Sequence, residues 1–455
     1  MSSRLPCPRL PASVVVAPLG TLLMLMACSS SEDARPEPSK ADGGQDAADD
    51  GATNEPTADA GSDAADAGEL VPPPYDFTVK CAVDPCVTQI AARGGMHACA
   101  VAKDGSVRCW GSNASGQLGA GGGDGSAIAV YEGTPKSVVG VSSAKGVSAT
   151  GESSAGTTCV VSDAGELVCF GSNAWGQLGR PSASERGPNP DPAVVEGIRA
   201  KSVTLTSRFA LAIGEDDRLW SWGTNDADQL ARDVSVPDAG PPKEAWPADL
   251  VASSVRFCAG TSKTGFAVTD EAVLSWGGGT FDQLGRPTSL AGDPVPAAIA
   301  LSDVSSLATG VAHACALGRG KVHCWGKNQR GQLGTGRKAE EVYPARVLFP
   351  PGVYPVAVAA GGDNTCSVAS SGDVYCWGAN GGGQLGTTSP LDESLPSRIE
   401  GLAEEAVGVA VMDEAICALL RGGSVACWGD NLLGQLGRGG RDLEAHPQPA
   451  PVVFK

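Results

Sequence analysis

The chain has 455 residues, a formal net charge of −18 at pH 7 and only 5% aromatic residues. Its 62 glycines and 32 prolines favour many short elements joined by tight turns, and they exclude a chain built of long helices. No basic stripe is present, so binding to nucleic acid lacks its main electrostatic driving force.

Residues 1–27 have the pattern of an export signal. Two arginines precede an apolar stretch from 13 to 27, which is shorter than the ~20 apolar residues that a membrane-spanning helix needs. Its end, Leu-Met-Ala-Cys at 25–28, resembles the lipobox of bacterial lipoproteins. The resemblance implies that Cys28 becomes the lipid-modified N-terminus, and Ser29 after it favours the outer membrane. Ordinary secretion with a chance cysteine is the alternative.

Residues 28–75 form an acidic linker rich in Ala, Asp, Gly and Pro. Between 29 and 75 there are 12 acidic residues and two basic ones, so this segment carries more than half of the net charge. Such a composition buries too little apolar surface to offset chain entropy, and its like charges repel one another. We expect a disordered tether that holds the folded part away from the membrane. Cation binding by the carboxylates is the alternative.

From residue 76 to 455, one phrase recurs seven times. It consists of an apolar strand, a short turn, a second strand ending in an aromatic residue and Gly, and then Gly-Gln-Leu-Gly. The steps between copies range from 49 to 60 residues, and the unit contains strands only. Because one such unit cannot bury its own faces, radial stacking into a propeller is favoured over a solenoid. The aromatic residues are Trp110, Phe170, Trp222, Trp276, Trp325, Trp377 and Trp428.

The phrase Cys-Trp-Gly-x-Asn-x-x-Gly-Gln-Leu-Gly resembles the repeats of the regulator of chromosome condensation family. The resemblance implies an all-β fold, a seven-bladed β-propeller of four-stranded blades over 76–455. We expect Trp and Leu of the phrase to fill the wedge between blades, and Gln to hydrogen-bond backbone across the gap. The phrase itself is therefore structural. The closure of the ring stays open, because the strand 451–454 could pair with 87–92 or with its own blade.

Twelve of the 15 cysteines fall into pairs. Ten occupy two fixed positions that face each other across a hairpin, and the two remaining repeats lack both. Facing residues have Cα atoms ~4.5–5.5 Å apart, which suits a disulfide, and an exported protein meets oxidising conditions. Reduced, buried cysteines are the alternative. The expected pairs are Cys99–Cys109, Cys159–Cys169, Cys315–Cys324, Cys366–Cys376, Cys417–Cys427 and Cys81–Cys86; apart from Cys7 in the signal and Cys28 at the lipid site, this leaves Cys258 unpaired.

The sequence predicts no catalytic site, no cofactor and no metal site. His97 and His313 share one repeat position, where other copies have Phe209 or Asn364, so packing or a backbone hydrogen bond is favoured over catalysis. Nucleophile-elbow, zinc-protease and phosphate-loop motifs do not occur, and the cysteines show no Cys-x-x-Cys zinc spacing. The alternative is an envelope polysaccharide lyase or hydrolase, which would need carboxylates and an aromatic residue converging at the central channel.

The loops after the Gly-Gln-Leu-Gly phrase vary in length, and binding surfaces often lie in such loops on a rigid frame. We therefore predict a monomeric, lipid-anchored module of the cell envelope that binds a protein, peptide or glycan, and no nucleic acid. An inhibitor of envelope hydrolases is an alternative. Guanine-nucleotide exchange, known in the family, is disfavoured by the export signal. The candidate binding residues are Tyr131, Trp175, Arg186 and Trp246.

Overall fold

The computed structural model describes residues 74–121, 128–181, 183–184, 187–232, 245–248, 251, 254–288 and 292–455. They belong to one compact unit, Gly68–Lys455. The predicted signal peptide, the linker up to residue 73, Cys28 and Arg186 lie outside the described residues. Within the described part, no helix is long and apolar enough to cross a membrane.

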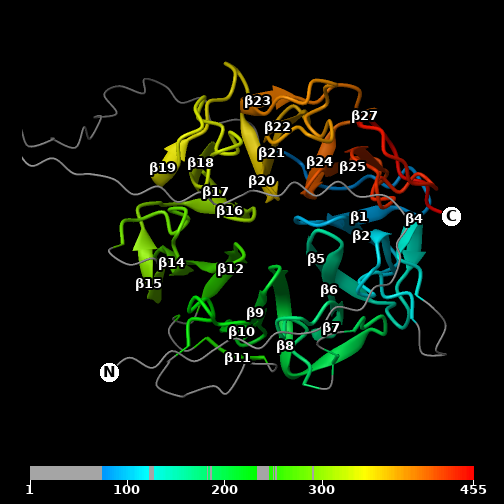
Figure 1. Ribbon diagram of the computed structural model, residues 1–455, viewed down its shortest axis with the longest axis horizontal. Helices are drawn as coiled ribbons and strands as arrows, with labels where there is room; N and C mark the ends of the chain where they lie inside the picture. The colour runs from blue at the N-terminus through cyan, green and yellow to red at the C-terminus, as the bar shows by residue number, and fades with distance from the viewer. Residues whose placement is uncertain are drawn as a thin grey trace, which may run out of the picture. The chain divides into compact units, whose positions relative to one another are not determined.

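The strands form six antiparallel sheets around a central axis, with β1, β12, β16, β20 and β24 nearest the centre (Figure 1). Five sheets have four strands and hold one repeat each. From the centre outward they are β1 (Val87–Ala91), β2 (His97–Ala102), β3 (Val107–Ser112) and β4 (Tyr131–Ser137); β12 (Val255–Gly260), β13 (Thr264–Thr269), β14 (Val273–Gly278) and β15 (Gly292–Ile299); β16 (Val304–Thr309), β17 (His313–Gly318), β18 (Lys321–Gly326) and β19 (Glu341–Arg346); β20 (Pro355–Gly361), β21 (Asn364–Ala369), β22 (Val374–Gly378) and β23 (Glu393–Arg398); and β24 (Ala406–Val411), β25 (Ala415–Leu420), β26 (Val425–Gly429) and β27 (His446–Pro451).

The sixth sheet holds repeats two and three together. Its strand β8 is 13 residues long and pairs with β7 through Ala193 and with β9 through Thr204. The expectation of seven separate sheets is therefore wrong for this part of the chain, because no turn interrupts β8 between the two repeats. The strands of this sheet are β5 (Ala144–Glu152), β6 (Ala155–Ser162), β7 (Glu166–Gly171), β8 (Ala193–Leu205), β9 (Phe209–Gly214), β10 (Leu219–Gly223) and β11 (Trp246–Pro247).

The ring closes where the sheet of the first repeat meets the sheet of the last, and neither sheet combines strands from the two ends of the chain. The C-terminal strand β27 pairs with β26 of its own repeat, where Ala450 faces Cys427, and β1 pairs with β2. A single parallel bridge, between Arg93 and Val411, joins the first repeat to the last. Backbone hydrogen bonds outside the strand pairs, such as that from the Val87 N–H to the Gly423 carbonyl, hold this junction together with side-chain packing.

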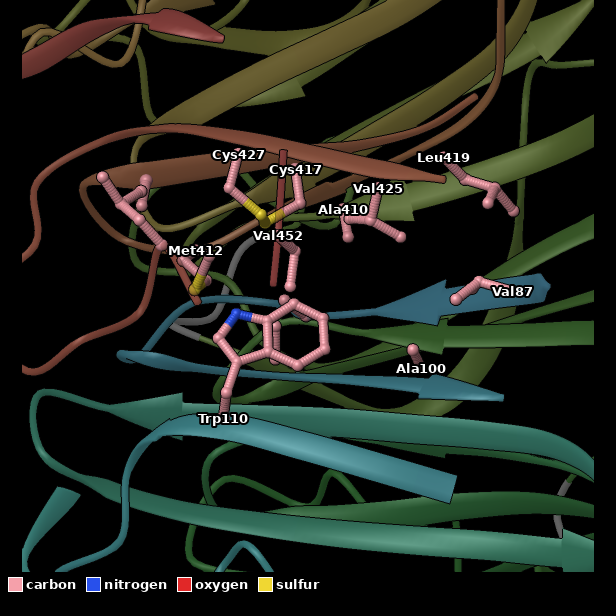
Figure 2. Packing of buried hydrophobic residues seen from close by; sticks show 14 of the residues in the cluster. Val87, Ala100, Trp110, Ala410, Met412, Cys417, Leu419, Val425, Cys427 and Val452 are labelled. Atoms are coloured by element: carbon pink, nitrogen blue, oxygen red, sulfur yellow. A yellow bond between two sulfur atoms is a disulfide. The ribbon is translucent and has the colours of Figure 1, made fainter. Parts of the chain in front are cut away.

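The aromatic residue of each repeat is fully buried against the preceding repeat. Figure 2 shows the junction of the first and last repeats, where the Trp110 ring lies near the disulfide between Cys417 and Cys427. The glycine after each aromatic residue adopts a φ between 95° and 112°, which favours glycine over residues with a Cβ. This explains why the aromatic-Gly pair recurs in every copy.

The indole N–H groups cross from one repeat to the next. Six tryptophans each donate a hydrogen bond of 2.8–2.9 Å to the backbone carbonyl of the glutamine in the preceding repeat. Phe170 has no such donor, and there the Thr158 hydroxyl donates to the Gln117 carbonyl at 2.8 Å. The glutamine side chains differ from expectation in part. Their Oε1 accepts an N–H of their own turn, as Gln177 does from Trp175, and few of their amide N–H groups donate to the next repeat.

The predicted cysteine pairs are bonded in the structure. The five hairpin disulfides each have a Cα–Cα distance of 4.1 Å, because their residues face each other directly on neighbouring strands. The sixth, between Cys81 and Cys86, has a Cα–Cα distance of 5.4 Å. Cys258 is a buried free thiol, and its burial raises its pKa to about 12.

Candidate binding face

The antiparallel order of the strands gives the ring two faces. We call the end that carries the turns between the first and second strands of each repeat the turn face; these turns are 92–96, 153–154, 206–208, 261–263, 310–312, 362–363 and 412–414. The loops with the Gly-Gln-Leu-Gly phrase lie at the same end. We call the opposite end the hairpin face; its hairpins are 103–106, 163–165, 215–218, 270–272, 319–320, 370–373 and 421–424.

The chain segment before β1 covers part of the hairpin face. We call residues 75–86 the strap, which contains the disulfide between Cys81 and Cys86. Its Lys80 N–H donates to the Arg421 carbonyl at 2.7 Å, and the Tyr75 hydroxyl donates to the Ala406 carbonyl at 2.7 Å. The Arg421 guanidinium lies 5.1 Å from the Tyr75 ring centroid, and burial raises the pKa of Tyr75. The N-terminal segment therefore joins the ring at the hairpin face of the last repeat.

The turn face contains a polar pocket of about 310 Å³. Lys327 pairs with both carboxylate oxygens of Asp363 at 2.9–3.0 Å, on one side of the pocket. Asp413 and Glu414 lie in its wall, with Arg330. Carboxylates and cations of three neighbouring repeats thus meet here, at the junction with the first repeat.

Asp413 is the most perturbed acid of this pocket. Its pKa is raised to about 7, first by burial and also by the nearby charges of Glu414 and Asp363, although backbone N–H groups of Gly95 and Ser153 oppose the shift. Burial also raises the pKa of Glu414. Asp413 forms no ion pair with another described residue, so it can exchange a proton near neutral pH.

Two aromatic side chains extend from the turn face on the other side of the ring. Trp175 is 37% exposed and Phe281 is 38% exposed, and both stand two positions before the glutamine of their repeat. The Arg208 guanidinium lies 4.5 Å from the Trp175 ring centroid, within cation–π range, and 3.6 Å from Asp226. Sequence reasoning selected Trp175 and missed Phe281, although the shared repeat position was a usable signal.

Comparison with known proteins agrees with this architecture. The chain matches the RCC1-like domain over residues 153–455 and the Regulator of chromosome condensation (RCC1) repeat over residues 87–117. The chain belongs to the RCC1-like domain family. Its relatives include the ultraviolet-B receptor UVR8 of Arabidopsis thaliana, 30% identical over 247 residues, which are 52% of this chain and 54% of UVR8.

A second relative is the human E3 ubiquitin-protein ligase HERC2, 30% identical over 251 residues, or 51% of this chain and 5% of HERC2. The chain thus spans about half of UVR8 and a small part of HERC2. Solved structures include Prp20p of Saccharomyces cerevisiae, with 19% identity, a TM-score of 0.63 and coverage of 79% of this chain and 88% of that chain. Human WBSCR16 has 21% identity, a TM-score of 0.65 and coverage of 77% and 94%. These two show the propeller fold alone.

The other candidate residues of this RCC1-like chain do not join the site. Tyr131 begins β4 and lies under the Arg441 guanidinium, 4.7 Å from its ring centroid, so it packs against the last repeat. Trp246 lies on β11 and pairs with Ser221. Tyr131 therefore packs apart from Trp175, whose side chain is exposed on the turn face beside Arg208.

The two repeat histidines have a structural partner that differs from expectation. His97 Nε2 lies 3.0 Å from the Thr158 hydroxyl and His313 Nε2 lies 2.9 Å from the Thr365 hydroxyl, each in the next repeat. Because each threonine donates its proton to a glutamine carbonyl, the histidine Nε2 must be the donor and the ring is neutral. Burial lowers both pKa values to about 4. A side-chain hydroxyl thus replaces the expected packing or backbone contact.

A larger cavity of about 940 Å³ lies between β8 and β11. Its lining is mainly apolar and includes Val194, Trp220 and Pro247. Residues 233–244 and 249–250, which flank β11 in the sequence, lie outside the described part of the chain.

Proposed function

We propose that this protein is a lipid-anchored interaction module of the cell envelope that binds a partner protein through its turn face. The strap is the observation that carries the proposal. It docks on the hairpin face, so the described N-terminal segment leaves the turn face uncovered. The turn face, with its pocket and exposed aromatic residues, is therefore free to bind a partner. The export-signal pattern and the six disulfides support a location outside the cytoplasm.

We also propose that the seven repeats act as seven blades that share strand β8 between two of them. Seven apolar clusters occur among the described residues, and each contains the aromatic residue of one repeat and strand residues of the repeat before it. The packing unit is therefore the repeat, whatever the hydrogen bonding of β8. Such a ring is a rigid support for the turn face.

The chemistry of the turn face suits a folded protein partner. An exposed Trp175 beside Arg208, and an exposed Phe281 two repeats further on, are typical of residues that dominate protein interfaces. The opposite flank holds Asp413 and Glu414, so the face offers both signs of charge for orienting a partner. The Prp20p structure is described with its binding properties to Gsp1p and histones, which supports protein binding by such propellers in general.

Capture from envelope extract tests the binding face. The full-length, oxidised protein is used as bait beside a variant with Trp175→Ala and Phe281→Ala, and beside Lys103→Ala on the hairpin face as the matched control. We expect one partner at near-stoichiometric yield with the native chain and the control, and its loss with the double variant. Equal capture by the double variant, or loss with Lys103→Ala, would overturn the assignment of the face.

Membrane fractionation tests the anchor. Cys28→Ser removes the thiol on which the lipid would form a thioether, so we expect the protein to move from the membrane fraction to the soluble fraction. Unchanged membrane association of this variant would contradict lipid anchoring at Cys28.

An envelope hydrolase or lyase is the second candidate function, and Asp413 favours it. A carboxyl group with a pKa of about 7 inside a pocket has the proton affinity that general acid–base catalysis requires. The pocket lining includes no aromatic residue that could serve as a sugar platform. Turnover of envelope polysaccharides that is abolished by Asp413→Asn would establish this function, whereas capture of a hydrolase as the partner would indicate an inhibitor.

A further inference from the structure

Arg93 reaches across the centre of the ring. The residue follows β1 in the first repeat, and its backbone carbonyl accepts a hydrogen bond of 2.9 Å from the Thr150 hydroxyl. Its guanidinium Nη1 donates to the Thr309 hydroxyl at 3.0 Å, although Thr309 belongs to the fifth repeat. Thr309 in turn donates to the Gly260 carbonyl at 2.8 Å. The guanidinium therefore lies inside the channel, among the turns of several repeats.

The charge of Arg93 has no compensating carboxylate in the described part of the chain. No Asp or Glu oxygen among those residues lies within 4.0 Å of its guanidinium, and the loss of water lowers its pKa to about 10. Of five N–H donors, one has a protein acceptor. Of the acids of the turn face, Asp363 pairs with Lys327, whereas Asp413, which has no ion pair, lies against Gly94 and Gly362 and not within 4.0 Å of the guanidinium. A cation in such surroundings is costly unless a counter-ion joins it.

A small cavity adjoins the guanidinium. Its volume of about 20 Å³ is lined by Arg93, by the hydroxyl-bearing residues Thr150, Ser207 and Ser262, and by glycines and Val311. This is room for about one water molecule or one monatomic ion, and too little for a carboxylate or a phosphate. The lining contains no carboxylate, and the Ser207 hydroxyl has no hydrogen-bond partner among the described residues. Arg93 and Ser207 thus both line the cavity, and each has donors without an acceptor among the described residues.

The glycines keep this cavity closed to larger ligands. A Cβ at Gly310 would lie 2.2 Å from His313 Cε1 and 2.6 Å from the Gly362 carbonyl oxygen. A Cβ at Gly151 would lie 2.6 Å from the Ala155 carbonyl oxygen. The turns therefore approach one another as closely as backbone allows, which fixes the small size of the cavity.

We propose that this channel cavity binds one halide ion, chloride in the cell, between the Arg93 guanidinium and the Ser207 hydroxyl. The ion neutralises the cation that crosses the ring and completes its hydrogen bonds. Because it contacts residues of separate repeats, it stabilises the folded ring and not the unfolded chain. The inference is independent of the partner that the turn face binds.

Thermal unfolding tests the site on the full-length, oxidised protein. Chloride replaces gluconate at constant ionic strength and pH, so that general screening stays the same. We expect a saturable rise of the midpoint by ~2 °C or more with chloride. Arg93→Gln should abolish the rise. The matched control Lys103→Gln removes one positive charge on the hairpin face and should preserve it. A rise that is absent in the native chain, or equal in Arg93→Gln, would overturn the proposal.

Two further measurements keep the test valid if Arg93→Gln does not fold. Ser207→Ala keeps the cation and removes one donor, so it should shift the chloride midpoint to at least several-fold higher concentration. Crystals of the native protein soaked in bromide should show an anomalous peak beside the guanidinium. Water density without such a peak would show that the cavity holds water only. An unchanged chloride midpoint in Ser207→Ala would show that Ser207 is not a ligand.

Discussion

The indole Nε1 of Trp110 donates a hydrogen bond of 2.9 Å to the backbone carbonyl of Gln435, and this bond joins the first repeat to the last. No strand is shared across this junction, because β1 and β27 each pair within their own repeat. The same bond recurs between other neighbours, for example from Trp222 to Gln177. At the junction, however, the two residues are separated by 325 positions in the chain. Closure of the ring therefore combines side-chain contacts with backbone hydrogen bonds between turns of the two repeats.

Trp110→Phe should weaken the closed ring. The variant leaves the buried Gln435 carbonyl without its donor and removes ring volume, so we expect a loss of about 2–4 kcal/mol in the free energy of unfolding. Urea unfolding with the disulfides intact measures it. The second repeat suggests a compensating change, because Thr158 faces Phe170 there and its hydroxyl donates to the equivalent acceptor, the Gln117 carbonyl. Adding Ala98→Thr, at the equivalent position, should restore about 1 kcal/mol.

If Ala98→Thr gave no recovery in the Trp110→Phe background, the hydrogen bond would not be the main contribution. Ala98→Thr alone serves as the control. In the sixth repeat, Thr365 and Trp377 both donate to the Gln332 carbonyl, so threonine and tryptophan are compatible. The single variant should therefore cost little stability.

The two buried histidines should make the protein sensitive to acid. Burial lowers the pKa of His97 and His313 from 6.5 to about 4, so protons bind the unfolded chain first as the pH falls. Their contribution to the free energy of unfolding is complete above pH 6.5 and is lost as the pH falls from about 6.5 to about 4. Each histidine accounts for a loss on the order of 3 kcal/mol. His97→Asn with His313→Asn should flatten this part of the profile, since Asn364 occupies the same position in the sixth repeat.

Chemical denaturation at intervals between pH 4 and pH 8 measures the effect. Each single variant should remove about half of the acid-induced loss, which separates this effect from general acid expansion. An unchanged slope in the double variant would mean that the histidines are protonated in the folded state or exposed to water.

Asp413 should act on stability in the opposite direction. Its pKa rises from 3.8 to about 7 on folding, so its contribution is complete below pH 3.8 and is lost as the pH rises to about 7. Asp413→Asn removes the buried charge and should raise stability at pH 8 by up to about 4 kcal/mol, with little difference at pH 4. The comparison is made in the background of the two histidine variants, so that the opposing titrations do not overlap. Equal destabilisation at both pH values would indicate a lost contact and not a titration.

The hairpin disulfides should each contribute modestly. Cys99 and Cys109 are ten residues apart. Closing a loop of that size lowers the conformational entropy of the unfolded chain and so destabilises it by about 2–3 kcal/mol. The replacement Cys99→Leu with Cys109→Ser copies Leu211 and Ser221 of the third repeat, so we expect this loss without a change of fold. Alkylation after unfolding without reductant provides the matching check. It should label Cys258 and none of the twelve paired cysteines.

Much of the fold was predictable from the chain because its determinants are local. The spacing of Trp110, Phe170 and their equivalents defines the repeats, and the register of each hairpin follows from its turn. That register places Cys99 opposite Cys109, so the covalent pairs could be inferred before any tertiary structure. Trp175 could be selected for the same reason, since it lies inside the recurring motif, two positions before Gln177.

Other features depended on residues that are far apart in the chain and meet only in the folded ring. Three examples are the hydrogen bond from Trp110 to Gln435, the hydrogen bond from Arg93 to Thr309, and the burial of Asp413 under the turns of the first two repeats. The continuous strand β8 is another, because its pairing with both neighbours decides where one sheet ends. Local sequence determines strands, turns and disulfides through short-range geometry. The tertiary structure alone decided ring closure, the buried charges and the proton affinity of the pocket, because these depend on which distant groups exclude water from one another.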